Sequence, residues 1–383
     1  MIAILKSKNK KEIILCTIFA IAIIFLAWLP SGFEKQIYIN AEAARATVLS
    51  VNNAGVYNTG LIKQGDQRCK IHIDSGSHKG EIVEAMNLFT GKIEFDKIFV
   101  EGDLAWVLLE RNSENEIIFA NMVDHYRIPA ILVLIGIFAG CLVLFSGFTG
   151  VRTLLSFSFA LLSIWKILVP LLLKGISPLL VAFLVGNAIT IATLLLVAGF
   201  TKRAYAAILG SIACSLIVCL LAWVFGYIFN VNGAVMQWSE SLLYAGFEHL
   251  DLTAIFQAGI YLACSGAILD LAIDISAALE EIVVNQPNIS KKELLHSGMR
   301  IGRSVVGSQT TTLLLAYMGG YLSVMMVYMA QGTPLLSIFN SKAIAAEILQ
   351  TFVGCIGLVI VCPLTTLISC AMLLNGNHHI KKA

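Results

Sequence analysis

The chain has 383 residues, of which 58% are hydrophobic and 13% are charged, and its mean hydropathy is +0.83. A water-soluble globular protein does not need that much apolar surface, and several apolar runs exceed the roughly 20 residues with which a helix crosses a bilayer. The composition therefore predicts an α-helical polytopic membrane protein. The net charge of +2 says little, so the positions of the charges decide the topology.

Residues 1–31 are predicted to form a cytoplasmic N-terminus and a first transmembrane helix. The apolar run from Ile13 to Leu29 follows a lysine-rich start. A cleaved signal peptide is the alternative, but the nearby Ala-x-Ala triplet, at 41–43, lies about a dozen residues beyond the apolar run. We therefore expect an anchor that is not cleaved.

Residues 32–126 form one polar block, which is predicted to be an extracytoplasmic domain. Apolar and polar residues alternate with a period of two in five short stretches, and turn signals such as Asn52-Asn53 and Gly65-Asp66 separate them. The expected strands are 46–51, 69–73, 81–85, 104–110 and 116–120. This pattern favours a small β-barrel of OB type.

No chemistry-bearing constellation is recognised in the polar block. His72, Asp74 and His78 could converge on a metal, but strand alternation makes His72 and Asp74 surface neighbours just as readily. Cys69 is the only cysteine outside the apolar segments, so no disulfide framework is expected there. The sequence also shows no nucleophile–base pair and no nucleotide loop. We expect no enzyme, no cofactor and no metal site.

Residues 127–375 are predicted to be a transmembrane domain of seven helices, which the anchor brings to eight, and 376–383 a cytoplasmic tail. The expected spans are 128–148, 153–173, 179–200, 205–229, 253–279, 305–330 and 344–374. The second of these is the weakest, because Lys166 and Pro170 interrupt it. The expected fold class is an α-helical membrane bundle of about eight helices with a small extracytoplasmic β-barrel domain.

Lysine and arginine placement predicts the orientation. With the N-terminus inside, Arg152, Lys202-Arg203, the 291–303 segment and Lys381-Lys382 also fall inside. The 231–252 connection, which has no lysine or arginine, falls outside. Both termini are therefore expected in the cytoplasm and the β-domain outside.

Asp270 and Asp274 lie within an otherwise apolar predicted span. A central aspartate costs roughly 2.5 to 3.5 kcal/mol on insertion. The four-residue spacing puts both on one helix face, about 6 Å and 12 Å from the midplane on the cytoplasmic side. Such a pair predicts ion or proton handling. The alternative is that both are protonated and hydrogen-bond a neighbouring helix.

The next span carries polar residues at similar depth, namely Ser308, Thr310 and Thr311, with Arg303 near the cytoplasmic mouth. These hydroxyls could complete an oxygen-lined ion site, or they could bond carbonyls of their own helix. Arg303 is level with Glu280 and Glu281, so the three are predicted to form an inner gate.

Two further features have open interpretations. Ser290 and Glu293 form a capping box, which starts a short amphipathic helix at the inner interface or belongs to a charged loop. Lys166 could be a counter-ion for the aspartates, or it could extend to a membrane surface.

The region around the aspartates resembles the YibE/F family. The residues that carry the likeness are Gly266-Ala-Ile-Leu-Asp270-Leu-Ala-Ile-Asp274-Ile-Ser, Ser290-Lys-Lys-Glu-Leu-Leu-His-Ser-Gly-Met, and the string from Ile301-Gly-Arg303 to Gly320. We expect the likeness to extend over about residues 40–374, anchor and barrel included. It implies a multi-pass plasma-membrane protein, without a settled biochemical function.

A more distant likeness is to the SecD/SecF branch of the RND permeases. Arg303, Ser308, Thr310 and Thr311 match an Arg-x-x-x-x-Ser-x-Thr-Thr string there, Asp270 matches a proton-coupling aspartate, and Glu280 or Glu281 matches a later acid. Leu269 replaces a polar residue, Asp274 has no firm counterpart, and two more helices precede the aspartate helix than in that six-helix bundle. The likeness implies an RND-like bundle. Bundles of this type work in pairs, which implies a homodimer or a related partner subunit.

The sequence predicts a secondary transporter or exporter in the lipid bilayer, driven by a proton or sodium gradient, with a small solute or metal ion as cargo. Asp270 and Asp274 would bind the coupling cation, and Ser308, Thr310 and Thr311 would complete the site. The alternatives are an accessory factor for protein translocation or envelope assembly, and a membrane scaffold or sensor that transports nothing. No feature suggests nucleic-acid binding.

Overall fold

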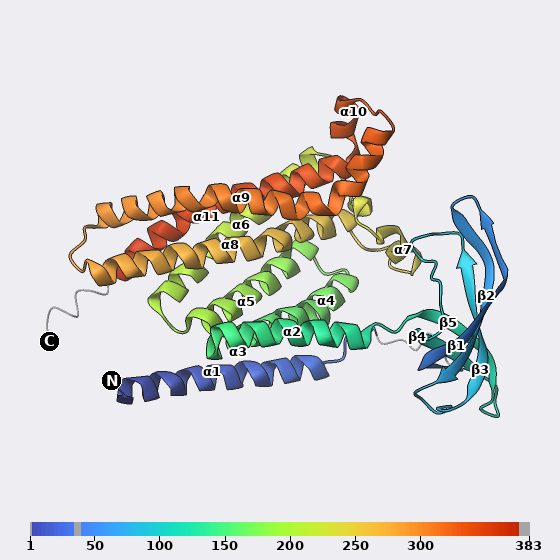
Figure 1. Ribbon diagram of the computed structural model, residues 1–383. Helices are drawn as coiled ribbons and strands as arrows, with labels where there is room; N and C mark the ends of the chain where they lie inside the picture. The colour runs from blue at the N-terminus through green and yellow to red at the C-terminus, as the bar shows by residue number, and fades with distance from the viewer. Residues whose placement is uncertain (1, 34–39, 375–383) are drawn as a thin grey trace. The chain divides into compact units, whose positions relative to one another are not determined.

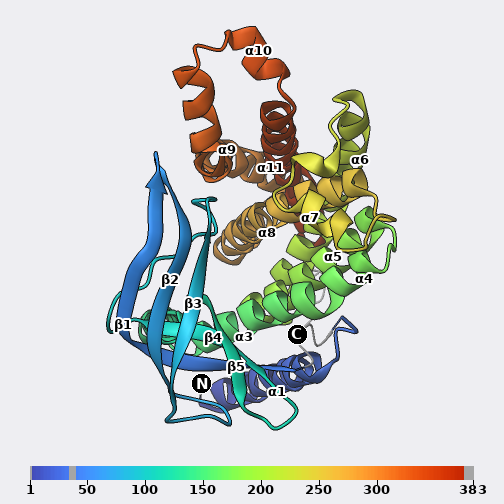
Figure 2. The ribbon, with the colours of Figure 1, turned by 90° about the vertical axis from the view of Figure 1, so that its right-hand side faces the viewer.

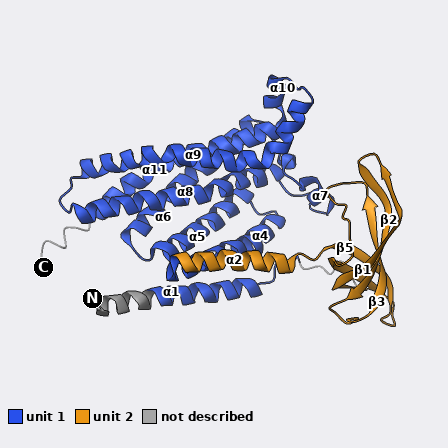
Figure 3. Ribbon diagram, in the orientation of Figure 1, with its two compact units in different colours: residues 1–33, 146–383 blue, residues 34–145 orange. Residues whose placement is uncertain are grey.

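The computed structural model describes residues 2–33 and 40–374, with side chains from residue 12 onward. The predicted tail, 376–383, lies outside these residues. The chain divides into two compact units, residues 1–33 with 146–383 and residues 34–145 (Figure 3). Each unit is described by itself below.

The described part of the second unit contains a closed barrel of five strands. They are β1 (Ala41–Thr59), β2 (Ile62–Ile73), β3 (Ile82–Thr90), β4 (Leu104–Arg111) and β5 (Ile117–His125). Their order around the barrel is β1-β2-β3-β5-β4, and β3 and β5 pair in parallel whereas the other neighbours pair antiparallel (Figure 1). The small barrel predicted from alternation is confirmed.

Alternation builds the barrel core, because successive side chains on a strand point to opposite faces. On β1, Ala44, Ala46 and Val48 point inward and are buried. Two polar side chains share this interior, Gln67 and Asn87. The oxygen of Gln67 accepts hydrogen bonds from the Asn87 side chain at 3.1 Å and from the Phe99 amide at 3.1 Å. Hydrogen bonds thus compensate the burial of Gln67 and of the Asn87 nitrogen, whereas Asn87 Oδ1 has no partner among the described residues. The same unit ends in α2 (Ile128–Ser146), whose apolar window buries no side chain.

The first unit is helical. Its elements are α1 (Ile2–Trp28), α3 (Phe148–Ser163), η1 (Ile164–Leu168), α4 (Val169–Leu173), α5 (Pro178–Ala198), α6 (Lys202–Ile228), η2 (Gly233–Val235), α7 (Ser239–Tyr244), α8 (Leu252–Asn285), α9 (Lys291–Ala330), α10 (Leu335–Asn340) and α11 (Lys342–Leu374). Over the described residues of both units, seven helices are long and apolar enough to cross a membrane, with α3, η1 and α4 counted as one. The apolar helix Glu12–Trp28 is shorter, so the eighth span stays a prediction.

The span that Lys166 and Pro170 interrupt contains a local change of helix type. Residues Ile164–Leu168 form a π turn between α3 and α4. Proline lacks an amide hydrogen and its ring crowds the preceding turn, so the regular hydrogen-bond ladder is broken at this point. The backbone stays helical across the break, and Phe148–Leu173 is one candidate span of 26 residues.

The prediction of a short amphipathic helix after Ser290 is wrong about the length of that helix. Ser290 caps the helix and the capping box with Glu293 is present, as predicted. The helix then continues without a break for 40 residues, from Lys291 to Ala330. Buried glycines explain why it stays attached: a Cβ at Gly298 would lie 2.5 Å from Thr366 Cγ2, and one at Gly302 would lie 3.1 Å from Cys362 Cβ. The start of α9 therefore packs on α11 instead of ending at an interface.

Helix α8 lies at the centre of the bundle, where it packs against α5, α6, α9 and α11 (Figure 2). Its hydroxyl at Ser276 lies 3.0 Å from that of Ser369 on α11, and both side chains are fully buried. A Cβ at Gly357 of α11 would lie 2.8 Å from Val218 and 3.2 Å from Ile268. Small residues therefore allow the three helices α6, α8 and α11 to meet closely.

Candidate functional site

Asp270 and Asp274 lie on a side of α8 that no other described element covers. Both side chains are exposed, whereas Leu271, Ala272 and Ile275 between and beside them are buried. Neither carboxylate has a hydrogen bond or ion pair within residues 12–33 and 40–374, although the charge of Asp274 acts on Asp270. The pair thus lies outside the core of its own chain.

The aspartates continue a row of small residues. Gly259, Ala263 and Gly266 are exposed at spacings of three and four, as are Asp270 and Asp274, so the five residues share one side of the helix. We call this row the acidic stripe. A Cβ at Gly259 or Gly266 would meet no atom within 4 Å, in contrast to the packed glycines of α9 and α11. The space beside these two glycines is therefore open within the described part of the chain.

An ion pair marks how deep the aspartates lie. Arg203 Nη1 at the start of α6 lies 3.4 Å from Glu280 Oε2 near the end of α8. Along the helix axis, Asp274 is about 9 Å and Asp270 about 15 Å from Glu280. Asp270 therefore lies almost three helical turns from the charged end of α8.

The hydroxyl groups of α9 bond to their own helix. Ser308 donates to the Val305 carbonyl at 2.9 Å, Thr310 to the Val306 carbonyl at 3.0 Å, and Thr311 to the Gly307 carbonyl at 3.1 Å. This is the plainer of the two interpretations that the sequence left open. Each hydroxyl oxygen keeps acceptor capacity, so a role in an ion site stays a prediction.

The predicted inner gate has different partners in the structure. Glu280 pairs with Arg203, and Glu281 accepts a hydrogen bond from Asn285 Nδ2 at 2.9 Å. Arg303 is exposed and forms no ion pair with any described side chain. The structure therefore does not bring the three gate residues together within one chain.

Lys166 lies in the π turn η1, in a continuous helical segment that packs against α5. Helix α5 in turn packs against α8, the helix that carries the aspartates (Figure 2). The predicted pairing of Lys166 with Asp270 or Asp274 remains a prediction.

Glu347 is a carboxylate that the sequence reasoning missed. It lies one turn into α11 and is 3% exposed, and its Oε1 atom has no hydrogen-bond partner among the described residues. Tyr317 and Tyr321 of α9 lie within electrostatic reach of it. The available signal was an acidic residue inside the predicted span 344–374. Its position near the end of that span made a surface location equally reasonable.

The polar groups of the barrel form separate pairs. His72 Nδ1 lies 2.9 Å from Asp74, whereas His78 Nδ1 lies 3.0 Å from Glu81. Burial opposes ionisation of Asp74, but hydrogen bonds from Thr47 and His72 and the charge of Arg45 outweigh it and lower the pKa of this carboxyl. His72 at the end of β2 and Asp74 just beyond it are thus neighbours, and His78 does not converge with them.

A family model described as YibE/F-like protein matches residues 134–375. That match covers more than half of the chain. The chain belongs to the YibE/F-like family. The match begins within α2, so the first helix and the barrel lie outside it, and the predicted extent of the likeness was too wide. Comparison with curated proteins found no match, and comparison with solved structures found none either. The comparisons give no support to a likeness to SecD and SecF.

Proposed function

We propose that this YibE/F-like protein is a multi-pass protein of the plasma membrane that couples a proton or sodium gradient to the export of a small solute. In this proposal both termini are cytoplasmic and the barrel is outside. The observation that carries it is the placement of Asp270 and Asp274 on one side of α8, about 15 Å and 9 Å along the axis from a charged helix end.

The energetics favour a working role over a structural one. A carboxylate at mid-membrane costs roughly 2.5 to 3.5 kcal/mol even by the mildest scale. Neither aspartate recovers this cost through a hydrogen bond to another described residue. Reversible binding of a cation would explain why the two carboxylates are kept. Protonation or ion binding neutralises their charge and thereby changes how α8 packs.

The proposal includes a cover for the acidic stripe. Acyl chains cannot solvate an ionised carboxylate, so the stripe faces water or another protein. A second subunit, either this chain or a related one, fits the open glycines at positions 259 and 266.

Asp270→Asn tests the coupling role. The protein is reconstituted into liposomes, a membrane potential is imposed, and the internal pH is recorded with a trapped dye. We expect the wild-type protein to carry protons, or sodium in a parallel assay. Asp270→Asn should lose at least about 90% of this flux, because it removes the carboxylate that takes up and releases the proton.

Glu240→Gln is the matched control, because Glu240 is an exposed carboxylate of α7 that does not belong to the stripe. It should leave the flux unchanged. A wild-type flux no larger than that of empty liposomes, or an unaltered flux in Asp270→Asn, contradicts the proposed coupling.

A further inference from the structure

The C-terminal half of helix α9 leaves a cavity beside α11. The cavity has a volume of about 320 Å³ and is lined by side chains of α9, α10 and α11. Figure 2 shows α10 between the end of α9 and the start of α11. All the side chains that line the cavity are apolar except Thr351. None of them belongs to the acidic stripe, so this part of the bundle is distinct from the candidate ion site.

The N-terminal half of α9 is packed much more tightly. Gly298 and Gly302 contact α11 closely, and a Cβ at Gly354 of α11 would lie 2.8 Å from Leu313 Cδ2. Leu313 is also the last buried residue of α9. The 17 residues from Leu314 to Ala330 include none that is buried. Packing therefore fixes α9 to α11 as far as Leu313 and leaves the remainder of the helix weakly held.

Four polar side chains lie along the same two helices. We call them the polar seam: Glu347 and Thr351 of α11, with Tyr317 and Tyr321 of α9. Glu347 and Thr351 are 3% and 4% exposed, and both tyrosines lie within electrostatic reach of Glu347. Three buried atoms of the seam have no hydrogen-bond partner among the described residues, namely Glu347 Oε1, Thr351 Oγ1 and the Tyr317 hydroxyl. Gln350 of α11 acts on Tyr317 without completing a hydrogen bond.

Solvent and ligands cannot supply these missing hydrogen bonds. The three atoms have almost no accessible surface, so a molecule in the neighbouring cavity cannot reach them. A buried polar atom without a partner is costly, and a cavity between apolar side chains is costly as well. Both features lie between α9 and α11. A movement of these two helices toward each other would remove both costs together.

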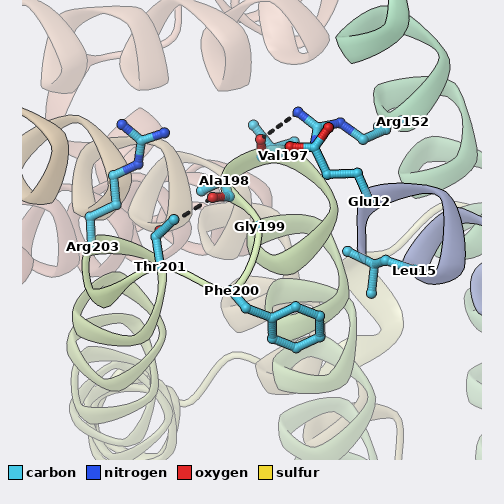
Figure 4. A pocket seen from close by; sticks show the side chains of 9 residues that line it. All are labelled: Glu12, Leu15, Arg152, Val197, Ala198, Gly199, Phe200, Thr201 and Arg203. Atoms are coloured by element: carbon cyan, nitrogen blue, oxygen red, sulfur yellow. Dashed lines mark hydrogen bonds and ion pairs between the residues drawn. The ribbon is translucent and has the colours of Figure 1, made fainter. Parts of the chain in front are cut away.

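A second cavity lacks this combination. It has a volume of about 260 Å³ and lies where α5 turns into α6 (Figure 4). Arg152 Nη1 there lies 3.6 Å from Glu12 Oε1, and Arg152 Nη2 donates to the Val197 carbonyl at 3.3 Å. Arg203, on the other side of the turn, pairs with Glu280 at 3.4 Å. Each charged group thus has its partner within the chain, in contrast to the carboxyl of the polar seam.

We propose that the C-terminal half of α9 closes onto α11, and that the hydroxyls of Tyr317 and Tyr321 then donate to the Glu347 carboxyl. Closure fills the cavity with the three methionines of α9 that line it, whose unbranched side chains adapt to a new packing. The structure shows the open arrangement of this two-state element. Closure involves no residue of the acidic stripe, so it and the proposed ion coupling can fail separately.

Disulfide cross-linking across the cavity measures closure in the full chain, reconstituted into liposomes. Met318→Cys on α9 and Ile348→Cys on α11 place thiols on two walls of the cavity. Cys141, which is exposed, is replaced by serine to reduce the background. Copper phenanthroline is the oxidant, and mass spectrometry of peptides identifies the linked positions. We expect a disulfide between positions 318 and 348, because closure brings their Cβ atoms to bonding distance.

Other cysteine pairs make this result specific. Leu322→Cys combined with Ile348→Cys should not cross-link, because Leu322 is 58% exposed and does not line the cavity. If the first pair does not fold, Leu314→Cys with Phe352→Cys offers a second pair of lining positions. The absence of a disulfide in folded protein with either lining pair overturns the proposal. Cross-linking of the Leu322 pair as fast as that of a lining pair also overturns it.

Tyr317→Phe, made with the 318–348 pair, separates closure from fixed packing. It removes a hydroxyl that bonds to nothing in this structure, so a fixed arrangement predicts an unchanged cross-linking rate. Closure loses a donor, and the rate should fall by roughly fivefold. Tyr328→Phe, on the same helix but outside the polar seam, is the matched control and should leave the rate unchanged. An unchanged rate in Tyr317→Phe overturns the proposal.

Glu347 gives the complementary test. Glu347→Leu removes the acceptor and should slow cross-linking of the 318–348 pair by roughly fivefold. Glu347→Gln keeps a side-chain oxygen that accepts hydrogen bonds, so its rate should stay within about twofold of the parent. Equal rates in the leucine and glutamine variants would mean that the acceptor plays no part, and would overturn the proposal.

Discussion

Glu280 Oε2 of α8 lies 3.4 Å from Arg203 Nη1 of α6, so the end of the aspartate helix is fastened to the start of a helix distant in sequence. The two side chains are 30% and 38% exposed. A double-mutant cycle of Glu280→Gln with Arg203→Gln should therefore give a coupling energy of at most about 1 kcal/mol. The same cycle with Arg303→Gln should give a value near zero. A larger coupling to Arg303 than to Arg203 in thermal unfolding of the purified protein would show that the pairing differs in the working molecule.

Gly357→Ala should destabilise the bundle. The added Cβ would lie 2.8 Å from Val218 Cγ2 and 3.2 Å from Ile268 Cδ1, so α6, α8 and α11 would have to separate. Overpacking of this kind costs about 1 to 3 kcal/mol. Gly319→Ala is the matched control, because a Cβ there meets no atom within 4 Å and alanine favours a helix by up to about 1 kcal/mol. The purified proteins are unfolded in increasing concentrations of a denaturing detergent. The midpoint of unfolding should be higher for Gly319→Ala than for wild type, and lower for Gly357→Ala. Equal stability of the two variants contradicts this packing.

The barrel should lose stability in acid through Glu42. Its carboxylate accepts hydrogen bonds from the Ser77 hydroxyl and amide and faces Arg111 at 3.1 Å, which lowers the pKa of Glu42. A lowered folded-state pKa contributes stability that is present above the unfolded value of about 4.3 and is lost as the pH falls through the folded value. The protection factors of the β1 amides in the full chain, that is, their exchange rates compared with the intrinsic rate at the same pH, should therefore fall below about pH 4.3. Glu42→Gln should flatten this pH dependence, and an unchanged slope would remove Glu42 as its cause.

Cys69 should resist thiol reagents while the barrel is folded. The side chain is fully buried, and burial raises its pKa to about 11. The thiolate is the reactive form, so little of it exists at pH 8. Leu61→Cys places a comparison thiol at the β1–β2 hairpin, where Leu61 is 94% exposed. Mass spectrometry after timed maleimide treatment should show position 61 modified at least about 100-fold faster than Cys69. Comparable rates would mean that the barrel opens readily.

The sequence was enough to predict those elements whose structure follows from one periodic pattern of apolar and polar residues. Alternation located all five strands of the described barrel, because a strand with one buried face must alternate. Lys166 and Pro170 predicted a weak point in their span, and the π turn lies there. The strand ends were less predictable, since β1 continues to Thr59 through mostly exposed residues that show no alternation of buried and exposed positions.

Features that depend on contacts distant in sequence were not predictable. The charged residues from Lys291 to Arg303 predicted a segment at the membrane interface. In the structure, Gly298 and Gly302 pack this segment against α11. Arg203 and Glu280 are far apart in the chain, and no spacing rule relates them. Glu347 illustrates the same limit, because hydropathy records a polar residue near a span's end but not that Tyr317 and Tyr321 lie beside it.

The unbroken length of α9 has a mechanical consequence. Forty residues make a rod about 60 Å long, twice the roughly 30 Å of hydrocarbon. If such a rod pivots near its middle by about 10°, each tip sweeps about 5 Å. A small change of tilt at the middle of α9 would thus be amplified into a displacement of several ångströms at both of its ends.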